Sequence, residues 1–387
     1  MISIGTTTIG DRLAVLSARG PGFDQIRLVA ALTVVAHHSW WGVNDILYRF
    51  SGGFIQLGLF AVVIFFCVSG FLLAPGLARS GDLVRFGVNR ALRILPALSV
   101  VVIASMFVLG PVLTTYSLAD YFGSAELYLY LKNAITLMSH YLPGVVRHGQ
   151  EVQINGPLWT LNIEVWSYAV LAVMSVAGFL RRRALTIISF ALVYLAYVGL
   201  ALSPSLHAAC PQRLLDFIGL FVYFIAGTSL YLYRESIPFS GIGAAIALGG
   251  ALIGLASGVG AVVLPLCIPY VVVYLGLSEV ASRVPLKHDL SYGVYLIHSP
   301  IILALLTLFD LTVGWPLALL AGSVTLVLAY ASWRFVEAPA LKQKVWVSLW
   351  LSSHLARPGR GRGVGGQARR DEPSNNLTGT IEAGAAE

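Results

Sequence analysis

The chain has 387 residues, of which 57% are hydrophobic and only 11% are charged. A water-soluble domain carries about 25% charged residues, so this composition excludes a soluble globular protein. The formal net charge of +7 would suit a nucleic-acid-binding protein, and the distribution of the basic residues along the chain decides that question.

Apolar runs recur at close to the length of about 20 residues with which a helix spans a bilayer. The sequence therefore predicts an all-α fold: a polytopic transmembrane helical bundle of about ten spans, with N- and C-termini cytoplasmic. The predicted spans cover residues 24–42, 54–78, 91–113, 158–180, 184–203, 214–233, 240–258, 261–278, 290–309 and 315–340.

Three regions are predicted: a cytoplasmic N-terminal segment at 1–22, a transmembrane domain at 23–344 and a disordered cytoplasmic tail at 345–387. The tail is predicted to be disordered because it is rich in Gly, Arg and polar residues. Between the third and fourth spans, residues 114–157 have mixed character, and Lys132 interrupts their apolar part. This segment is predicted to be a re-entrant or interfacial helix and not an eleventh span.

Basic residues gather in the segments predicted to be cytoplasmic, as the positive-inside rule requires. With the N-terminus inside, only four of the 25 Lys and Arg lie in outer segments: Arg49, Lys132, Arg147 and Arg213. The positive charge is therefore a signal of topology, and nucleic acid is excluded as a partner.

Two adjacent histidines, His37 and His38, end the apolar run of the first span. Ionisable residues inside a span are costly, so each is a functional candidate. Arg27 and His38 are eleven positions apart, which places both on one helix face and separates them by ~16 Å along the axis. His38 is the functional candidate, although a histidine that only reaches the outer interface is the alternative. His37, turned ~100° away, is expected to take that structural role or to bond a carbonyl.

Glu164, in the fourth span, is a second candidate. It lies ~9 Å past the outer start of that span, and His38 is near the outer end of its own, so the two are predicted at similar depth. A carboxylate beside an imidazole fixes its tautomer, as a general base requires. Alternatively, Glu164 only favours the positive N-terminal end of its helix.

Arg90 and Arg93 are spaced i, i+3 on one helical face at the cytoplasmic mouth of the third span. Such a pair suits phosphates, because arginine combines a permanent charge with bidentate hydrogen bonding. The alternative is that both arginines only anchor the span on its cytoplasmic side.

The ninth span contains His298 near its middle, flanked by Tyr292 and Tyr295 and followed by Pro300. The proline bends the helix and frees a carbonyl. The residues themselves favour a packed histidine that bonds such a carbonyl.

Two further pairs have structural interpretations. Arg334 and Glu337, spaced i, i+3, are expected to form an ion pair. Ser69 and Gly70 are small residues that permit close helix contact. The three cysteines show no spacing typical of metal ligands, and no metal is expected.

These blocks, taken in order over roughly residues 23–342, resemble the acyltransferase 3 family of integral-membrane O-acyltransferases. FDQIRLVAALTVVAHH is similar to the family's N-terminal signature, an arginine followed after ten residues by a histidine, which selects Arg27 and His38. FGVNRALRILPAL carries its Arg-x-x-Arg pair, and LWTLNIEVWSY resembles its segment ending in a glutamate. GLFAVVIFFCVSGFLLA, LSYGVYLIHSPI and WRFVEAPA are similar to three more blocks. Val165 and Ala338 depart from the family pattern; neither departure touches the Arg27 and His38 pair, but they put the family's substrate pocket in question for this chain.

The resemblance implies transfer of an acyl group, commonly acetyl, from cytoplasmic acyl-CoA (acetyl-CoA) to a hydroxyl. The acceptor would be a carbohydrate or lipid-linked glycan, such as a cell-surface or exopolysaccharide unit, and the location a bacterial cytoplasmic (inner) membrane, with the bilayer as the other partner. The site residues would be His38 and Glu164 for catalysis, Arg27, Arg90 and Arg93 for the donor, and Trp159, Tyr292 and His298 for the substrate.

Other functions fit the same residues. A transporter or flippase of a glycolipid intermediate would use His38 and Glu164 as a proton relay. Two more alternatives are a non-enzymatic membrane protein that binds acyl-CoA and an enzyme that acylates a secreted small metabolite. In both, the arginines would bind the acyl-CoA. Within the enzyme hypothesis, His38 either acts as base on the acceptor hydroxyl or carries the acyl group covalently.

Overall fold

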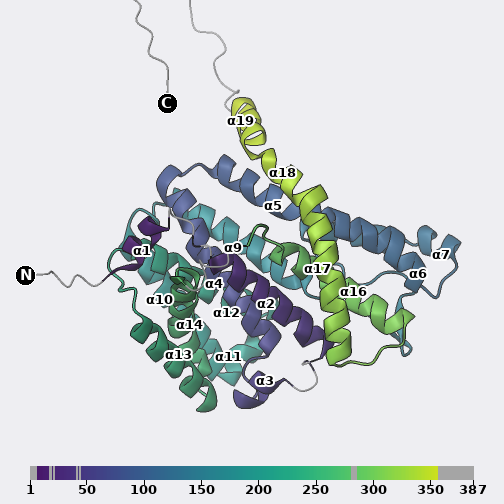
Figure 1. The fold of residues 1–387 in the computed structure, drawn as a ribbon, viewed down its shortest axis with the longest axis horizontal. Helices are drawn as coiled ribbons and strands as arrows, with labels where there is room; N and C mark the ends of the chain where they lie inside the picture. Colours follow the sequence, from purple (N-terminus) through teal and green to yellow (C-terminus); the bar gives the residue numbers. More distant parts are fainter. Residues whose placement is uncertain are drawn as a thin grey trace, which may run out of the picture.

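The computed structural model of the chain describes residues 7–16, 20, 22–40, 42, 45–279 and 286–355. The fold is a bundle of helices (Figure 1), as the all-α prediction requires. The described residues also contain one short antiparallel hairpin, formed by β1 (Val146–Arg147) and β2 (Gln150–Glu151).

Among the described residues, ten α-helices or helical turns precede the hairpin. They are α1 (Ile9–Val15), α2 (Gly22–Ser39), α3 (Ile46–Phe50), α4 (Leu57–Ser80), α5 (Leu83–Ala104), the π-helical turn η2 (Ser105–Leu109), α6 (Gly110–Leu113), α7 (Leu118–Gly123), α8 (Ala125–Leu129) and the 3₁₀ turn η3 (Tyr130–Ile135).

The C-terminal half continues after the hairpin. Its described elements are α9 (Leu158–Val176), α10 (Arg183–Leu202), α11 (Pro204–Ala209), α12 (Gln212–Leu232), α13 (Gly241–Ala256), α14 (Gly260–Gly276), α16 (Ser291–Leu308), α17 (Trp315–Ser332), the π-helical turn η4 (Trp333–Glu337), α18 (Ala338–Lys342) and α19 (Lys344–Leu355).

Seven helical runs in the described residues are long and apolar enough to cross a membrane. They are Leu57–Ser80, Leu83–Leu113, Leu158–Val176, Arg183–Leu202, Gln212–Leu232, Ser291–Leu308 and Trp315–His354. Each of them coincides with a predicted span. The remaining three predicted spans coincide with α2, which is less apolar, and with the shorter apolar helices α13 and α14. The total of ten spans and the cytoplasmic termini stay predictions.

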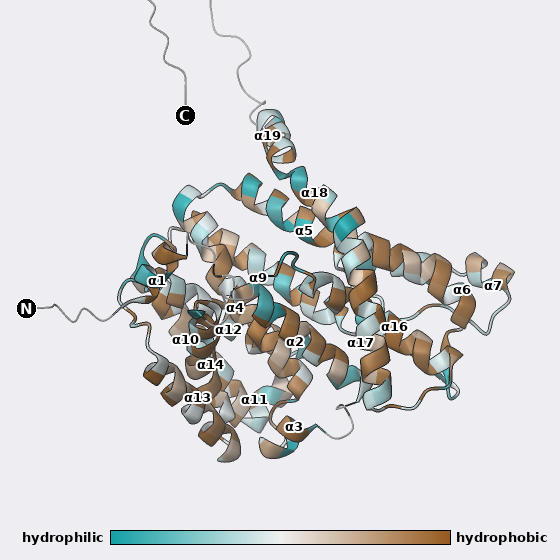
Figure 2. Ribbon diagram, in the orientation of Figure 1, coloured by the Kyte–Doolittle hydropathy of each residue, from teal (hydrophilic) through white to brown (hydrophobic). Residues whose placement is uncertain are grey.

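Helices α2 and α4 form the centre of the bundle (Figure 1). α4 packs against α12, α2 and α14, and α2 packs in turn against α16 and α17. In Figure 2, hydrophobic residues cover most of these helices, whereas hydrophilic residues gather on α18 and the beginning of α5. α18 and α5 contact each other, so the hydrophilic end of the bundle contains the part of α5 with Arg90 and Arg93, which the sequence predicts to mark the cytoplasmic side.

The crossing of α4 and α12 depends on two glycines, as the small residues of α4 had suggested. A Cβ added to Gly70 would lie 1.9 Å from the carbonyl oxygen of Phe224, and one added to Gly227 would lie 2.3 Å from that of Cys67. Any side chain at either position would therefore push the two backbones apart.

Residues 114–157 contain no helix of span length, which agrees with their exclusion from the predicted spans. They form the short helices α7 and α8, the turn η3 and the hairpin. The end of the segment enters the bundle, where Ile154 and Asn155 are buried. The Asn155 side-chain amide donates to the carbonyl of Leu296 at 2.8 Å. Pro300 has no N–H for that carbonyl four residues earlier, so Asn155 supplies the missing donor.

The tail was predicted to be disordered from residue 345, but the structure has a helix at its start. Residues 345–355 belong to α19, which lies against α5 near its contact with α18 and extends away from the bundle in Figure 1. The sequence KVWVSLWLSSHL retains enough apolar residues to form a helix there. Residues 356–387 lie outside the described part of the chain.

Candidate active site

Two cavities lie inside the bundle and share one wall. The charged cavity, about 540 Å³, is lined by Asp24, Arg27, Ser69, Arg90, Arg93, Glu164, Tyr168, Asp289, Tyr292 and Lys344, among others. The histidine cavity, about 440 Å³, is lined by His37, His38, Gln56, Gln153, Trp159 and Ser299, among others. Val62, Thr160 and Tyr295 border both, and the hydroxyls of Thr160 and Tyr295 lie 2.5 Å apart. These three residues form the wall.

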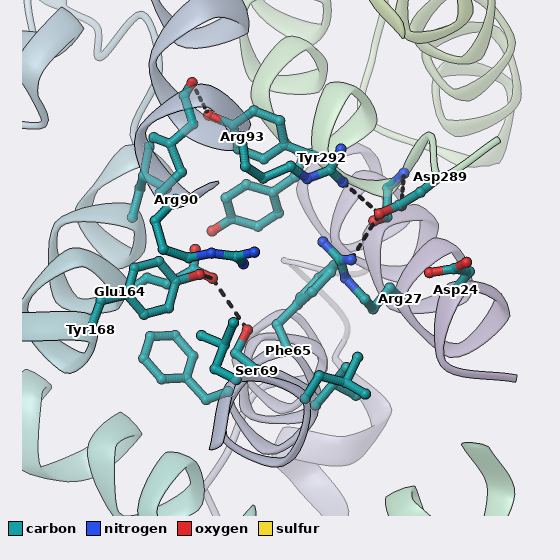
Figure 3. A pocket seen from close by; sticks show the side chains of 18 of the residues that line it. Asp24, Arg27, Phe65, Ser69, Arg90, Arg93, Glu164, Tyr168, Asp289 and Tyr292 are labelled. Carbon is teal, nitrogen blue, oxygen red and sulfur yellow. Dashed lines mark hydrogen bonds and ion pairs between the residues drawn. The ribbon is translucent and has the colours of Figure 1, made fainter. Parts of the chain in front are cut away.

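One carboxylate organises the charged cavity (Figure 3). Oδ2 of Asp289 lies 2.8 Å from Nη1 of Arg27 and 2.5 Å from Nη2 of Arg93. Its Oδ1 accepts the hydroxyl of Ser291 at 2.5 Å. Burial of Asp289 opposes ionisation, but the two guanidinium charges and the Ser291 hydrogen bonds outweigh it and lower the pKa of the carboxyl to about 2. Asp289 is therefore ionised at neutral pH, between two arginines.

Arg93 has a second partner from the other end of the chain. Its Nη1 lies 3.1 Å from Oε2 of Glu337, which is buried. The predicted pair of Glu337 with Arg334 is wrong: Arg334 is exposed. The reason is the π-helical turn η4, whose wider i→i+5 bonding removes the i, i+3 alignment of an α-helix.

Arg90 is the arginine of the charged cavity that forms no ion pair in the described part of the chain, unlike Arg27 and Arg93. Its Nε is buried and has no hydrogen-bond partner there, and its guanidinium lies 5.9 Å from the centre of the Tyr168 ring. Figure 3 shows this guanidinium pointing into the cavity. Lys344 lines the same cavity. This part of the cavity is suited to an anionic ligand.

Glu164 lies in the charged cavity, and the predicted contact with His38 is not formed. Its Oε1 accepts the hydroxyl of Ser69 at 3.2 Å and that of Tyr168 (Figure 3). His38 and Glu164 line different cavities, although the sequence placed them at similar depth. The preceding segment enters the bundle at Asn155, so the first turn of α9 already borders the histidine cavity. Glu164, six residues after the start of α9, lies on the other side of the wall, in the charged cavity.

The partner of His38 is another histidine. Nδ1 of His38 lies 3.1 Å from Nε2 of His298, and the two rings are stacked with centroids 5.1 Å apart. His38 is exposed to the histidine cavity, whereas His298 is 0% exposed. His37 is buried and its Nδ1 lies 3.2 Å from Oδ2 of Asp45. His37 therefore has a structural contact, with Asp45 and not with a backbone carbonyl. The catalytic role of His38 stays a prediction.

The structure separates the predicted site residues into two groups. Arg27, Arg90, Arg93, Glu164 and Tyr292 line the charged cavity, and His38 and Trp159 line the histidine cavity. Tyr292 packs under Arg93 and donates its hydroxyl to the carbonyl of Ile94 at 2.7 Å. His298, expected from the sequence to bind substrate, lines neither cavity, and its ring is fully buried behind His38.

Sequence reasoning missed Asp289 and Asn155. Asp289 is a lone acid two residues before α16, and its position between two arginines comes from the packing of three distant segments. Asn155 had one usable signal, since a proline inside a span frees a carbonyl that needs a donor. Nothing in the sequence identified which residue would supply it.

The geometry defines a helical membrane protein that presents a histidine to one cavity and arginines to an adjoining one. The profile of the acyltransferase domain family, acyltransferase 3, matches residues 21–334. The chain belongs to this family, and it is therefore an acyltransferase.

Two relatives cover most of the chain. An O-acetyl transferase of Shigella phage Sf6 is 30% identical over 323 residues, which are 81% of this chain and 94% of the relative. Nodulation protein 10 of Rhizobium leguminosarum bv. viciae is 27% identical over 362 residues, which are 83% of this chain and 93% of the relative. No solved structure matches.

Proposed function

We propose that the protein is a membrane O-acetyltransferase that moves an acetyl group from acetyl-CoA in the charged cavity to a hydroxyl in the histidine cavity. The observation that supports this most directly is the shared wall of Thr160 and Tyr295, with cations on one side and His38 on the other. The phage relative described as an O-acetyl transferase supports acetyl as the acyl group.

The donor would enter the charged cavity with its phosphates toward Arg90 and Lys344. The charges of Arg27 and Arg93 are already offset by Asp289, so Arg90 is the arginine of the predicted three that is free to bind a phosphate. The hydrophilic end formed by α5 and α18 would face the cytoplasm, in agreement with the positive-inside rule. The acyl end would then reach the wall.

His38 would act on the acceptor from the opposite side of the wall. As the hydroxyl oxygen attacks the acyl carbon, His38 takes the hydroxyl proton; the carbon–sulfur bond breaks, and the CoA thiolate receives that proton. If His38 attacks first, an acyl-histidine forms, CoA leaves, and the hydroxyl then attacks it. Either route ends with the ester and free CoA.

Glu164 is proposed to act on the donor side, since it does not orient His38. Its Oε1 is occupied by Ser69 and Tyr168. Glu164→Gln keeps an oxygen for these two hydrogen bonds and removes the charge. A catalytic role predicts a lower kcat with an unchanged thermal midpoint, and a kcat equal to that of the wild type would leave Glu164 as a structural residue.

The acceptor is proposed to be a carbohydrate, free or lipid-linked, in a bacterial inner membrane. Trp159 offers an aromatic surface, and Gln56 and Gln153 offer amides to the histidine cavity. Aromatic faces and amide groups suit the apolar faces and hydroxyls of a sugar. The described lining of this cavity lacks Lys, Arg, Asp and Glu, so a neutral hydroxyl-bearing acceptor fits better than an ionic one.

The test uses membrane vesicles that contain the wild-type protein or His38→Phe. With acetyl-CoA outside inverted vesicles and a membrane lipid extract plus methyl glucoside as acceptors, the wild type should release free CoA and esterify an acceptor. His38→Phe should do neither. Translocation of a glycolipid without CoA release would instead establish the flippase hypothesis.

A further inference from the structure

His298 is fully buried, borders neither cavity and contacts the ring of His38. We infer that His298 is a positioning residue: it holds His38 in the tautomer that leaves Nε2 as the atom facing the acceptor. This inference rests on the proposed acyl transfer, and it concerns which atom of His38 performs it.

The hydrogen position on His298 follows from its backbone contact. Nδ1 of His298 lies 2.7 Å from the carbonyl oxygen of Tyr295. A carbonyl oxygen can only accept, so Nδ1 must donate. In a neutral imidazole the other nitrogen then carries a lone pair, and Nε2 of His298 is an acceptor.

The second step fixes His38. Its Nδ1 is the atom 3.1 Å from Nε2 of His298, and an acceptor there requires a donor. His38 must therefore carry its hydrogen on Nδ1. Two cationic rings stacked at 5.1 Å would repel each other, so the neutral arrangement is the stable one. The lone pair of His38 is left on Nε2, the ring nitrogen that His298 does not occupy.

The arrangement also serves the charged state that forms during transfer. When Nε2 takes the acceptor proton, the positive charge spreads over the ring of His38. Nδ1–H then makes a charge-assisted hydrogen bond to Nε2 of His298, which is roughly twice as strong as the neutral one. His298 does not touch the substrate in this step, and it neither gains nor loses a proton.

Two substitutions of similar size separate this role from simple packing. In His298→Asn, the amide nitrogen replaces Nδ1 and keeps the bond to Tyr295, but nothing reaches His38. In His298→Gln, the longer amide places an oxygen near the position of Nε2 and restores an acceptor for His38. We expect kcat to fall about 100-fold in His298→Asn, as for loss of a correctly oriented base, and less than tenfold in His298→Gln. The KM for acetyl-CoA should stay within twofold in both.

The assay measures CoA release from purified, detergent-solubilised protein with acetyl-CoA and methyl glucoside. Equal rates for His298→Asn and His298→Gln would overturn the inference, because an acceptor facing His38 would then make no difference to turnover. If the wild type releases no CoA with methyl glucoside or with the membrane lipid extract, the proposed function itself fails.

A second measurement reads the wild-type protein itself and does not depend on turnover. Nitrogen-15 NMR of histidine-labelled wild type at pH 8, with the His38 signals assigned by their loss in His38→Gln, reads the tautomer directly. We expect a protonated Nδ1 and a bare Nε2 on His38. A hydrogen on Nε2 would overturn the inference even in a fully active enzyme.

Discussion

Arg27 and Arg93 share a single carboxylate oxygen, Oδ2 of Asp289, at 2.8 and 2.5 Å. Arg27 is on α2, Arg93 is on α5, and Asp289 precedes α16, so one side chain joins three segments far apart in sequence. The same contact determines which arginine is available to bind an anionic ligand. Two of the three predicted donor-binding arginines are compensated by protein carboxylates, and Arg90 remains for an anion from outside.

Asp289→Asn is expected to destabilise the bundle by roughly 2–4 kcal/mol. The variant leaves two guanidinium groups close together without their shared anion, and breaking a buried ion pair costs about 3–5 kcal/mol. The lower range allows for the 13–23% exposure of the side chains to the cavity. Thermal unfolding in detergent measures the effect. Asp216→Asn, which changes a carboxylate bonded to Gln212, is the control and should shift the midpoint little; equal midpoints for the two variants would contradict the bridging role.

The contribution of Asp289 to stability depends on pH in a defined direction. The pKa of Asp289 is lowered to about 2 in the folded protein, against about 3.9 in an unfolded chain. Its stabilising contribution is therefore complete above about pH 5 and is lost as the pH falls through 4 toward 2. The difference in midpoint between wild type and Asp289→Asn should stay constant from pH 8 to 5 and shrink below pH 4. A difference that already shrinks between pH 7 and 5 would show that Asp289 titrates normally.

Arg90→Gln should raise the KM for acetyl-CoA by tenfold or more while kcat changes less than threefold. A charge-assisted hydrogen bond contributes about 1.5–3 kcal/mol, and 1.4 kcal/mol corresponds to a factor of ten in affinity. Arg85→Gln is the matched control, because Arg85 lies on the same helix, is exposed and does not line the cavity. Initial rates of CoA release give both constants. Equal KM values for the two variants would place the phosphates elsewhere.

Gly70→Ala is expected to prevent correct packing of α4 on α12. The added methyl group would meet the Phe224 carbonyl oxygen at 1.9 Å, a contact that only backbone movement relieves. Gly76→Ala, on the same helix, meets nothing within 4 Å. Size-exclusion profiles and thermal midpoints in detergent should therefore separate the two variants, with Gly76→Ala close to the wild type. A well-folded Gly70→Ala protein would show that this crossing is looser than the structure indicates.

Sequence patterns within a single helix predicted which face of that helix a residue lies on and which end of the bundle it is near. The eleven-residue spacing on the first span selected His38 over His37, and the structure exposes the first to a cavity and buries the second. The grouping of Arg27, Arg90 and Arg93 near one end also followed from topology. Contacts between helices were beyond these signals. The depth of Glu164 was estimated from a span assumed to start at the surface, and the pairing of Glu337 from an α-helical turn that is π-helical here.

Asn155→Ala tests the link between the segment that enters the bundle and α16, the helix that carries His298. Asn155 holds the Leu296 carbonyl, two residues before His298 and four before Pro300. Without this donor the carbonyl is buried and unpaired, which costs about 1–3 kcal/mol, and the turn that carries His298 is less well fixed. We expect kcat to fall at least tenfold. Asn133→Ala removes a buried asparagine that bonds within its own segment, to Tyr130 and Ser139, so it should lower the thermal midpoint similarly and leave kcat within twofold. A kcat reduced equally in both variants would mean that general loosening of the segment, and not the position of His298, limits transfer.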